Sequence, residues 1–390
     1  MSHRELQDKN ETDKDHNRTE EEESTSVSTT LSGSHSIPIP FVSFIVTGFG
    51  PFGGVPDNPT SIIVNGMKEY LASSEENSTS NSNNWKKELL PHLQHCLVLE
   101  TSAHAVQEAF RDDDDNDANG TSPVGGGGGE IAKLVRENLT NTTETKQITI
   151  TVLLHLGVNY QGTQIQLEEC SYNDATFRIP DQRGYKPYKE TIHVHCSKRG
   201  GVISSAPPPP FGSCCKTSIN VHQLCHDLNE NINNNSNNNS LVAEAATTAR
   251  NANLRGGGRA SAAAVYDGNT TACNKPSSSN NNTIVTVSTD PGRFVCNVLI
   301  YTSLSKYQHT TTTFNTSNSD ASNNSHEDKN DNGSSSSLSK SQPQPVQKLV
   351  HSLFVHVPPF NTTKYNCGKE EQFHYIAMIM DKLKSCKYFS

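Results

Sequence analysis

The sequence predicts a single α/β domain in which a largely parallel central sheet is covered by helices on both faces. Three observations lead to this prediction. Apolar runs typical of strands alternate along the chain with segments whose apolar residues recur at helical spacing. Polar low-complexity segments interrupt that alternation. Without those segments roughly 220 residues remain, which is a suitable size for one domain.

The first predicted strand, residues 42–48, is an apolar run that ends at a glycine. A helix is predicted to follow, because Asn58 is a favoured N-cap residue and Pro59 suits the first helical position. One face of this helix is apolar and would pack against the sheet. The residues at that helical spacing are Ile63, Met67, Tyr70 and Leu71.

A second strand is predicted at residues 95–100, followed by a helix at 103–111 that runs into an acidic insert. Residues 131–139 are predicted either to continue that helix or to form a second, short one. Residues 148–157, ITITVLLHLG, are rich in apolar and β-branched residues and are predicted to form a buried central strand.

In the C-terminal half, strands are predicted at 284–288 and 353–357, with a helix at 297–307 between them. Two more helices are indicated by apolar stripes at helical spacing. The first stripe consists of Val221, Leu224, Cys225 and Leu228, and the second of Phe373, Ile376, Ala377, Met380 and Leu383.

Low-complexity composition marks the parts that we expect to lie outside the folded core. Residues 1–38 are predicted to be a disordered polar tail, and residues 39–390 the folded domain. Within that domain, disordered inserts are predicted near 112–130, 229–282 and 310–344. Such segments bury too little apolar surface to offset the entropy of ordering them.

Composition narrows the class of protein. The net charge is −9 and the basic residues are scattered, which argues against nucleic acid as the main partner. The polar N-terminal region has no apolar core typical of a secretory signal, and no apolar stretch approaches the roughly 18 residues of a membrane span. The ten cysteines are irregularly spaced and read as reduced thiols. A cytoplasmic protein without a membrane partner is therefore expected.

The stretch FIVTGFGPFGGVPDNPT, residues 44–60, contains the spacing G-x-G-x-x-G. A nucleotide-binding loop is disfavoured, because Pro51 interrupts the motif, no helix can begin before about Asn58, and no lysine follows. The remaining feature is a loop with Phe49 and Phe52 at the carboxyl end of the first strand, where open α/β sheets bind ligands. The two rings could hold a small, flat, uncharged group, or they could fill the core.

Three residues could form a nucleophilic site. Cys296 follows a predicted turn and would lie near a helix N-terminus, where the dipole favours a thiolate, although a buried inert thiol is the alternative. His356 lies in an apolar strand and could be a general base or a hydrogen-bonded core histidine. Glu168 could orient that histidine or simply be solvated, and its neighbour Glu169 is a rival for the same role.

Four distinctive motifs follow one another along the chain. They are VTGFGPFGGVPDNPT, LLHLGV followed by QLEECSYNDATFRIPDQRGYKP, STDPGRFVCNVLIYTSL, and SLFVHVPPF. Together they resemble the type I pyroglutamyl peptidases (pyrrolidone-carboxylate peptidases) over roughly residues 42–385. The resemblance implies a three-layer α/β/α fold and a cysteine-type omega peptidase that removes N-terminal pyroglutamate (5-oxoproline) from peptides.

The resemblance also implies roles for individual residues. Cys296 would be the nucleophile and His356 the base. Glu168, rather than Glu169, would be the orienting carboxylate, because it lies ten positions before Arg178 as the motif requires. Arg178 would lie near the oxyanion.

The substrate pocket is likewise implied by the resemblance. Phe49 and Phe52 would sandwich the lactam ring, Ile179 would line the pocket, and Asn58 would hydrogen-bond the ring. Helix capping is a sufficient reason for an asparagine at position 58. The expected partners are peptides with an N-terminal pyroglutamate, and no cofactor is expected.

Two alternatives remain open at the level of sequence. The inserts could block turnover and leave a non-catalytic binder of pyroglutamyl-capped peptides. The stretch 193–226 contains HVHC and HQLCH, which could suggest zinc, but it has no C-x-x-C pair, and surface histidines are the default reading. No metal site is therefore predicted.

Overall fold

The structure is a computed structural model, and its described elements belong to the unit Ile39–Ser390. The described residues are 40–53, 56–73, 84–112, 128–140, 148–192, 209–234, 283–307, 312–314, 346–360 and 368–389. The predicted tail and most of the three predicted inserts lie outside them and stay predictions.

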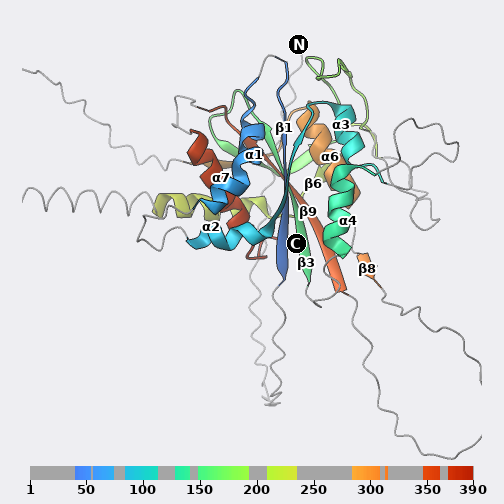
Figure 1. The fold of residues 1–390 in the computed structure, drawn as a ribbon. Helices are drawn as coiled ribbons and strands as arrows, with labels where there is room; N and C mark the ends of the chain where they lie inside the picture. Colours follow the sequence, from blue (N-terminus) through green and yellow to red (C-terminus); the bar gives the residue numbers. More distant parts are fainter. Residues whose placement is uncertain are drawn as a thin grey trace, which may run out of the picture. The chain divides into compact units, whose positions relative to one another are not determined.

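A mixed, mostly parallel sheet forms the centre of the fold (Figure 1). Its strand order is β2 (Leu93–Leu99), β1 (Phe41–Phe49), β3 (Thr149–Val158), β9 (Val346–Val357), β4 (Ile165–Glu168) and β7 (Val285–Ser288). The first four strands are parallel to one another. Strand β4 runs antiparallel to β9 and parallel to β7, and β8 (Thr312–Phe314) pairs antiparallel with the start of β9.

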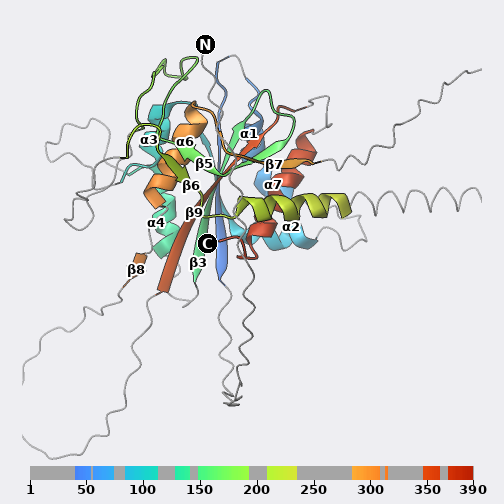
Figure 2. The same cartoon turned by 180° about the vertical axis from the view of Figure 1, so that it is seen from behind.

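Helices cover both faces of this sheet, which confirms the predicted α/β architecture (Figures 1 and 2). One face carries α1 (Pro59–Ala72), α2 (Asn84–Leu89) with the short η2 (Leu90–His92), α7 (Lys369–Leu383) and the helical residues 221–234. The other face carries α3 (Ala103–Ala109), α4 (Glu130–Thr140) and α6 (Val295–Tyr307). A small two-stranded antiparallel sheet, β5 (Cys170–Tyr172) with β6 (Cys214–Lys216), lies against α6.

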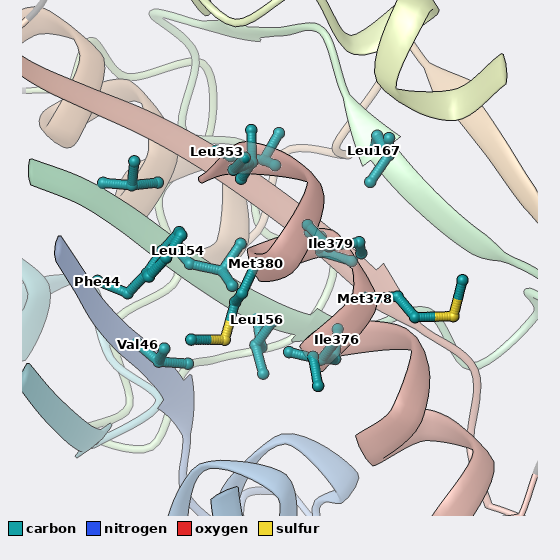
Figure 3. Packing of buried hydrophobic residues seen from close by; sticks show 14 of the residues in the cluster. Phe44, Val46, Leu154, Leu156, Leu167, Leu353, Ile376, Met378, Ile379 and Met380 are labelled. Carbon is teal, nitrogen blue, oxygen red and sulfur yellow. The ribbon is translucent and has the colours of Figure 1, made fainter. Parts of the chain in front are cut away.

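The alternation of strand side chains divides the core into two layers. On β9, Leu353 and Val355 face α1 and α7, whereas Phe354 faces α6. Figure 3 shows the first layer, in which side chains of β1, β3 and β9 meet the apolar face of α7. His356 shares the face of Phe354, so it points into the layer that contains α6.

Most predicted elements are present, with instructive differences at their ends. Residues 131–139 form a separate helix, α4, and not a continuation of α3. Strand β9 begins at Val346, seven residues before the prediction, because its first half mixes polar and apolar residues and so lacks an apolar run. The helix that starts at Val221 extends through 234, into the first residues of the range expected to be an insert. Within the described ranges, no helix has the length and apolar character that a membrane crossing requires.

A fully buried histidine, which no sequence pattern had indicated, links the sheet to α6. His155 Nδ1 lies 2.8 Å from Thr47 Oγ1 of β1, and its Nε2 lies 3.0 Å from Ser303 Oγ of α6. Ser303 Oγ in turn lies 2.6 Å from Ser352 Oγ of β9. These hydrogen bonds satisfy the buried polar groups and fix the position of α6 along the sheet.

Acidification is expected to destabilise the fold through two buried histidines. Burial lowers the pKa of His155 to about 3 and that of His351 to about 4, from an ordinary value of 6.5. Below the ordinary value the unfolded chain takes up protons that the folded chain excludes. The contribution of these two histidines to stability is therefore complete above about pH 6.5 and decreases as the pH falls, by about 1.4 kcal/mol per pH unit for each.

Urea unfolding at about pH 7 and about pH 5 measures this effect, in a range where most carboxylates stay ionised. The variant His351→Gln should show roughly half of the pH dependence. Equal stability of the unmodified protein at the two pH values would contradict the assignment.

Candidate active site

The first turn of α6 carries Cys296. The chain reaches this helix through a turn in which the Gly292 N–H donates to Asp290 Oδ1 at 3.1 Å. Gly292 has a φ of 78°, a left-handed conformation that favours glycine. Cys296 is half-buried and is the second residue of α6. It therefore lies at the predicted place, where first-turn amides lack helical partners and the dipole is positive.

His356 and Glu168 come together through the antiparallel pairing of β9 with β4. In that register Gln166 is opposite His356 and Glu168 is opposite Phe354. Glu168 is thus a diagonal neighbour of His356 on the same face of the sheet. His356 Nδ1 lies 2.6 Å from Glu168 Oε1, and the Glu168 side chain has no solvent exposure. Oε2 of Glu168 has no hydrogen-bond partner among the described residues.

A glycine leaves the space in which the sulfur lies beside the histidine. Gly157 of β3 is paired with His356 of β9 in the sheet register. A Cβ atom at position 157 would lie 3.0 Å from Cys296 Sγ and 2.6 Å from Cζ of Phe354. Any larger residue at this position would displace the sulfur or the ring, so Gly157 sets the approach of α6 to β3 and β9.

The electrostatic state of His356 reflects both neighbours. Burial alone lowers the pKa of His356, but hydrogen bonds to Cys296 and Glu168, together with the charges of these two groups, outweigh it. The net effect raises the pKa of His356 from 6.5 to about 9. Since Nδ1 faces Glu168, Nε2 is the nitrogen left for Cys296. An imidazole with a raised pKa is protonated near neutral pH and can act as a general acid.

Glu169, the rival of Glu168, faces away from this group. Its carboxylate lies 2.9 Å from Lys216 Nζ and 3.5 Å from His222 Nε2. Its pKa is lowered, chiefly by the hydrogen bond from Lys216. Of the two adjacent glutamates, Glu168 is therefore the one that contacts His356.

The two phenylalanines of the glycine-rich loop have different surroundings. Phe49 is 2% exposed and belongs to the core layer of α6. Phe52 is half-buried, and its ring centroid lies 6.0 Å from that of Phe294 and 6.5 Å from that of Tyr160. Core filling, one of the two roles left open by the sequence, accounts for Phe49, whereas the Phe52 ring stays partly accessible. A ligand contact for either ring stays a prediction.

Asn58 is the N-cap of α1 and also holds the loop. Its Oδ1 accepts a hydrogen bond from the Thr60 N–H at 3.1 Å, and its Nδ2 donates to the Gly50 carbonyl at 3.0 Å. The capping role predicted from the sequence is confirmed. The predicted contact with a substrate ring is not tested by these bonds.

Arg178 and Ile179 lie on the surface. Ile179 is 50% exposed, and its Cδ1 lies 4.0 Å from the position of a Cβ on Gly53, so it packs against the glycine-rich loop. Arg178 is exposed, and among the described residues its guanidinium has no ion-pair partner. Their roles toward a substrate stay predictions.

Three residues that pack around Phe52 or lie next to Cys296 were given no site role from the sequence. Tyr160 and Phe294 are the two rings that accompany Phe52, and we call these three residues the aromatic group. Tyr160 is 46% exposed and follows the end of β3, where the Asn159 N–H donates to the Val357 carbonyl at 2.9 Å. Asn297 is fully buried beside Cys296. An aromatic residue just after a central strand is the only sequence signal for Tyr160.

Residues that could bind a metal ion lie apart from Cys296, on the helix that begins at Val221. Among the described residues, one group of three candidate ligands consists of His226, Asp227 and Glu230. Asp227 Oδ2 already accepts from Tyr388 Oη at 2.7 Å and lies 2.6 Å from Lys387 Nζ. This group has protein partners, and among the described residues no contact links it to Cys296. The HVHC part of the stretch 193–226 lies outside the described residues.

Comparison with known proteins identifies similar solved structures. No family model and no curated protein matches the chain. Pyroglutamyl peptidase I from Bacillus amyloliquefaciens is 12% identical, with 88% of this chain and 97% of that chain covered and a TM-score of 0.39. Pyrrolidone carboxyl peptidase from Thermus thermophilus is 15% identical, with 87% and 98% covered and a TM-score of 0.38. The enzyme from Fervidobacterium islandicum AW-1 is 16% identical, with 88% and 98% covered and a TM-score of 0.40. Identities and TM-scores of this size do not establish the function of this chain, which depends on its own residues.

Proposed function

We propose that this chain is a cysteine-type omega peptidase that removes N-terminal pyroglutamate from peptides through an acyl-enzyme. The observation that carries the proposal is that Glu168 Oε1 lies 2.6 Å from His356 Nδ1, while Cys296 Sγ packs against Gly157, the residue of β3 paired with His356. Cys296 and Glu168 both contribute to the raised pKa of His356. The four collinear sequence motifs support the substrate class.

Acylation begins with the thiolate of Cys296 and the imidazolium of His356. The sulfur attacks the pyroglutamyl carbonyl carbon and forms a C–S bond, while the carbonyl oxygen takes up negative charge. The backbone N–H of Cys296 at the start of α6 stabilises that oxyanion, and the exposed Arg178 adds positive charge. His356 then donates its proton to the departing amine as the C–N bond breaks.

Deacylation uses the same imidazole in the opposite sense. Neutral His356 removes a proton from water, which attacks the thioester and releases pyroglutamate and the Cys296 thiolate. Glu168 holds the ring by its bond to Nδ1 and stabilises the positive charge that returns to His356.

Recognition of a lactam needs little charge, because a pyroglutamyl ring has no free amine. The aromatic group and Ile179 offer apolar, partly accessible surface of the kind that suits a flat ring. Such a surface disfavours an ordinary N-terminal residue, whose ammonium group would lose its hydration without gaining a partner.

A panel of arylamides tests the proposal. With a thiol reductant present, the protein should release arylamine from the pyroglutamyl derivative and not from the prolyl, glutaminyl or alanyl derivatives. The glutaminyl compound is the matched control, because it is the open-chain counterpart of the lactam. Calorimetric binding of a pyroglutamyl peptide without any release would favour the binder alternative, and release from the whole panel would contradict the substrate class.

A further inference from the structure

The segments that carry Glu168 and Cys296 are joined by a set of contacts that the proposed chemistry does not use. Glu168 ends β4, and the chain continues through β5 to about residue 176. This continuation packs against the segment from 289 to 297, which leads into α6. The Tyr172 hydroxyl donates to the Thr289 carbonyl at 2.9 Å, and the Thr176 N–H donates to the Arg293 carbonyl at 3.2 Å.

Asn297 is the buried centre of this junction. Its Oδ1 accepts from the Tyr172 N–H at 2.9 Å, and its Nδ2 donates to the carbonyls of Tyr172 at 2.8 Å and Asp174 at 2.9 Å. Both amide hydrogens are used, so the side chain has no donor left for a substrate. Asn297 is adjacent to Cys296 in the first turn of α6, so these three bonds fix that turn directly.

Arg293 forms the outer part of the same junction. Its Nε donates to Asp174 Oδ2 at 3.1 Å, and its guanidinium lies 4.1 Å from the centre of the Tyr172 ring. The Arg293 side chain is 30% exposed, whereas Asn297 has no exposure. The buried amide bonds are therefore the ones shielded from competing water.

We propose that Asn297 is a positioning residue whose side-chain amide locks the first turn of α6 to the chain that continues from Glu168 and so holds Cys296 against His356. This inference rests on the proposed function, because it concerns the same sulfur and imidazole. Displacement of a reacting group by about 1 Å can cost 10²-fold in rate. Without the amide, the Tyr172 N–H and the Asp174 carbonyl lose their bonds to Asn297, whereas the Tyr172 carbonyl keeps the Asp174 N–H, so the turn is expected to shift.

The variant Asn297→Ala tests this role against a matched control. Asn229→Ala removes an amide with similar bonds at the start of the edge strand β7, at the end opposite to Ser288, the residue paired with Glu168. There Asn229 Nδ2 donates to the Val285 carbonyl at 2.8 Å and Oδ1 accepts from the Val285 N–H at 3.1 Å. We expect kcat of Asn297→Ala to fall about 10²-fold at nearly unchanged KM. Asn229→Ala should keep its kcat even if it unfolds more easily.

The NMR titration of the His356 ring is the second readout, assigned by comparison with His356→Gln. In Asn297→Ala the ring should lose the contribution of Cys296, so its pKa should fall from about 9 toward 6.5. A purely structural role would lower the melting temperature and leave this titration unchanged. If Asn297→Ala does not fold, Arg293→Ala should move the titration in the same direction by a smaller amount.

An unchanged titration and kcat in every folded variant would overturn the positioning role. The titration needs no turnover, so it also separates the two proposals. Failure of the unmodified protein to release arylamine would reject the proposed function. A shifted His356 titration in Asn297→Ala would still support the positioning role of Asn297.

Discussion

Replacement of Cys296 with serine is expected to reduce arylamine release by roughly 10⁴-fold or more. A serine hydroxyl at this position is far less acidic than a thiol, so His356 cannot hold it as an anion in the resting enzyme. The substitution replaces one atom, Sγ by Oγ, and should leave the fold intact. Initial rates at saturating substrate, compared with the circular dichroism of both proteins, measure the effect.

Cys215→Ser is the matched control for this variant. Cys215 packs against the same helix, with its Sγ 3.6 Å from Ser305 Oγ, but it is remote in sequence from the proposed triad. Its replacement should leave release unchanged. Release by Cys296→Ser at the level of the unmodified protein would reject the sulfur as nucleophile.

Glu168→Gln is expected to have the second largest effect, a loss of roughly 10²–10⁴-fold in kcat. Glutamine keeps the shape of the side chain, but it removes the negative charge that helps to raise the pKa of His356. The imidazolium that protonates the leaving amine is lost as the pH rises through the pKa of His356. The alkaline limb of the rate profile should therefore lie near pH 9 in the unmodified protein and at lower pH in Glu168→Gln.

The neighbouring Glu169→Gln provides the comparison, because Glu169 contacts Lys216 and not His356. Its rate profile should match that of the unmodified protein.

Thermal unfolding measured as a function of pH provides a second, independent test. A histidine with a raised pKa stabilises the fold fully below about pH 6.5 and loses this contribution as the pH rises toward 9, so Glu168→Gln should weaken that dependence. Equal effects of the two glutamate variants would contradict the assignment of the carboxylate.

Local chemistry made much of the fold predictable. Strand β3 is rich in apolar and β-branched residues because it is central and covered on both faces, and that composition is visible in one sequence. The Asn58-Pro59 pair fixed the start of α1 to the residue. The reversed direction of β4 was not predictable in the same way, because it is a four-residue strand whose direction is set by its partners β9 and β7.

In the candidate site, too, the individual residues were predictable from local sequence, whereas their contacts were not. Cys296, His356 and Glu168 could be nominated because each has chemistry of its own and lies in a recognisable motif. Their contact depends on the pairing of β4 with β9 and on the space left by Gly157, neither of which any one segment encodes. Asn297 escaped notice because an asparagine in a helix has many uses, and only the three backbone partners from residues 172 and 174 distinguish it.

Capture of the acyl-enzyme tests the central claim most directly. An activated pyroglutamyl ester should acylate the protein faster than water releases the product, so an acid quench within the burst phase traps the intermediate. Peptide mass spectrometry should then find one pyroglutamyl group in thioester linkage at Cys296, with the other nine of the ten cysteines unmodified. Turnover of the ester with no adduct on Cys296, or with the adduct on another residue, would contradict the account.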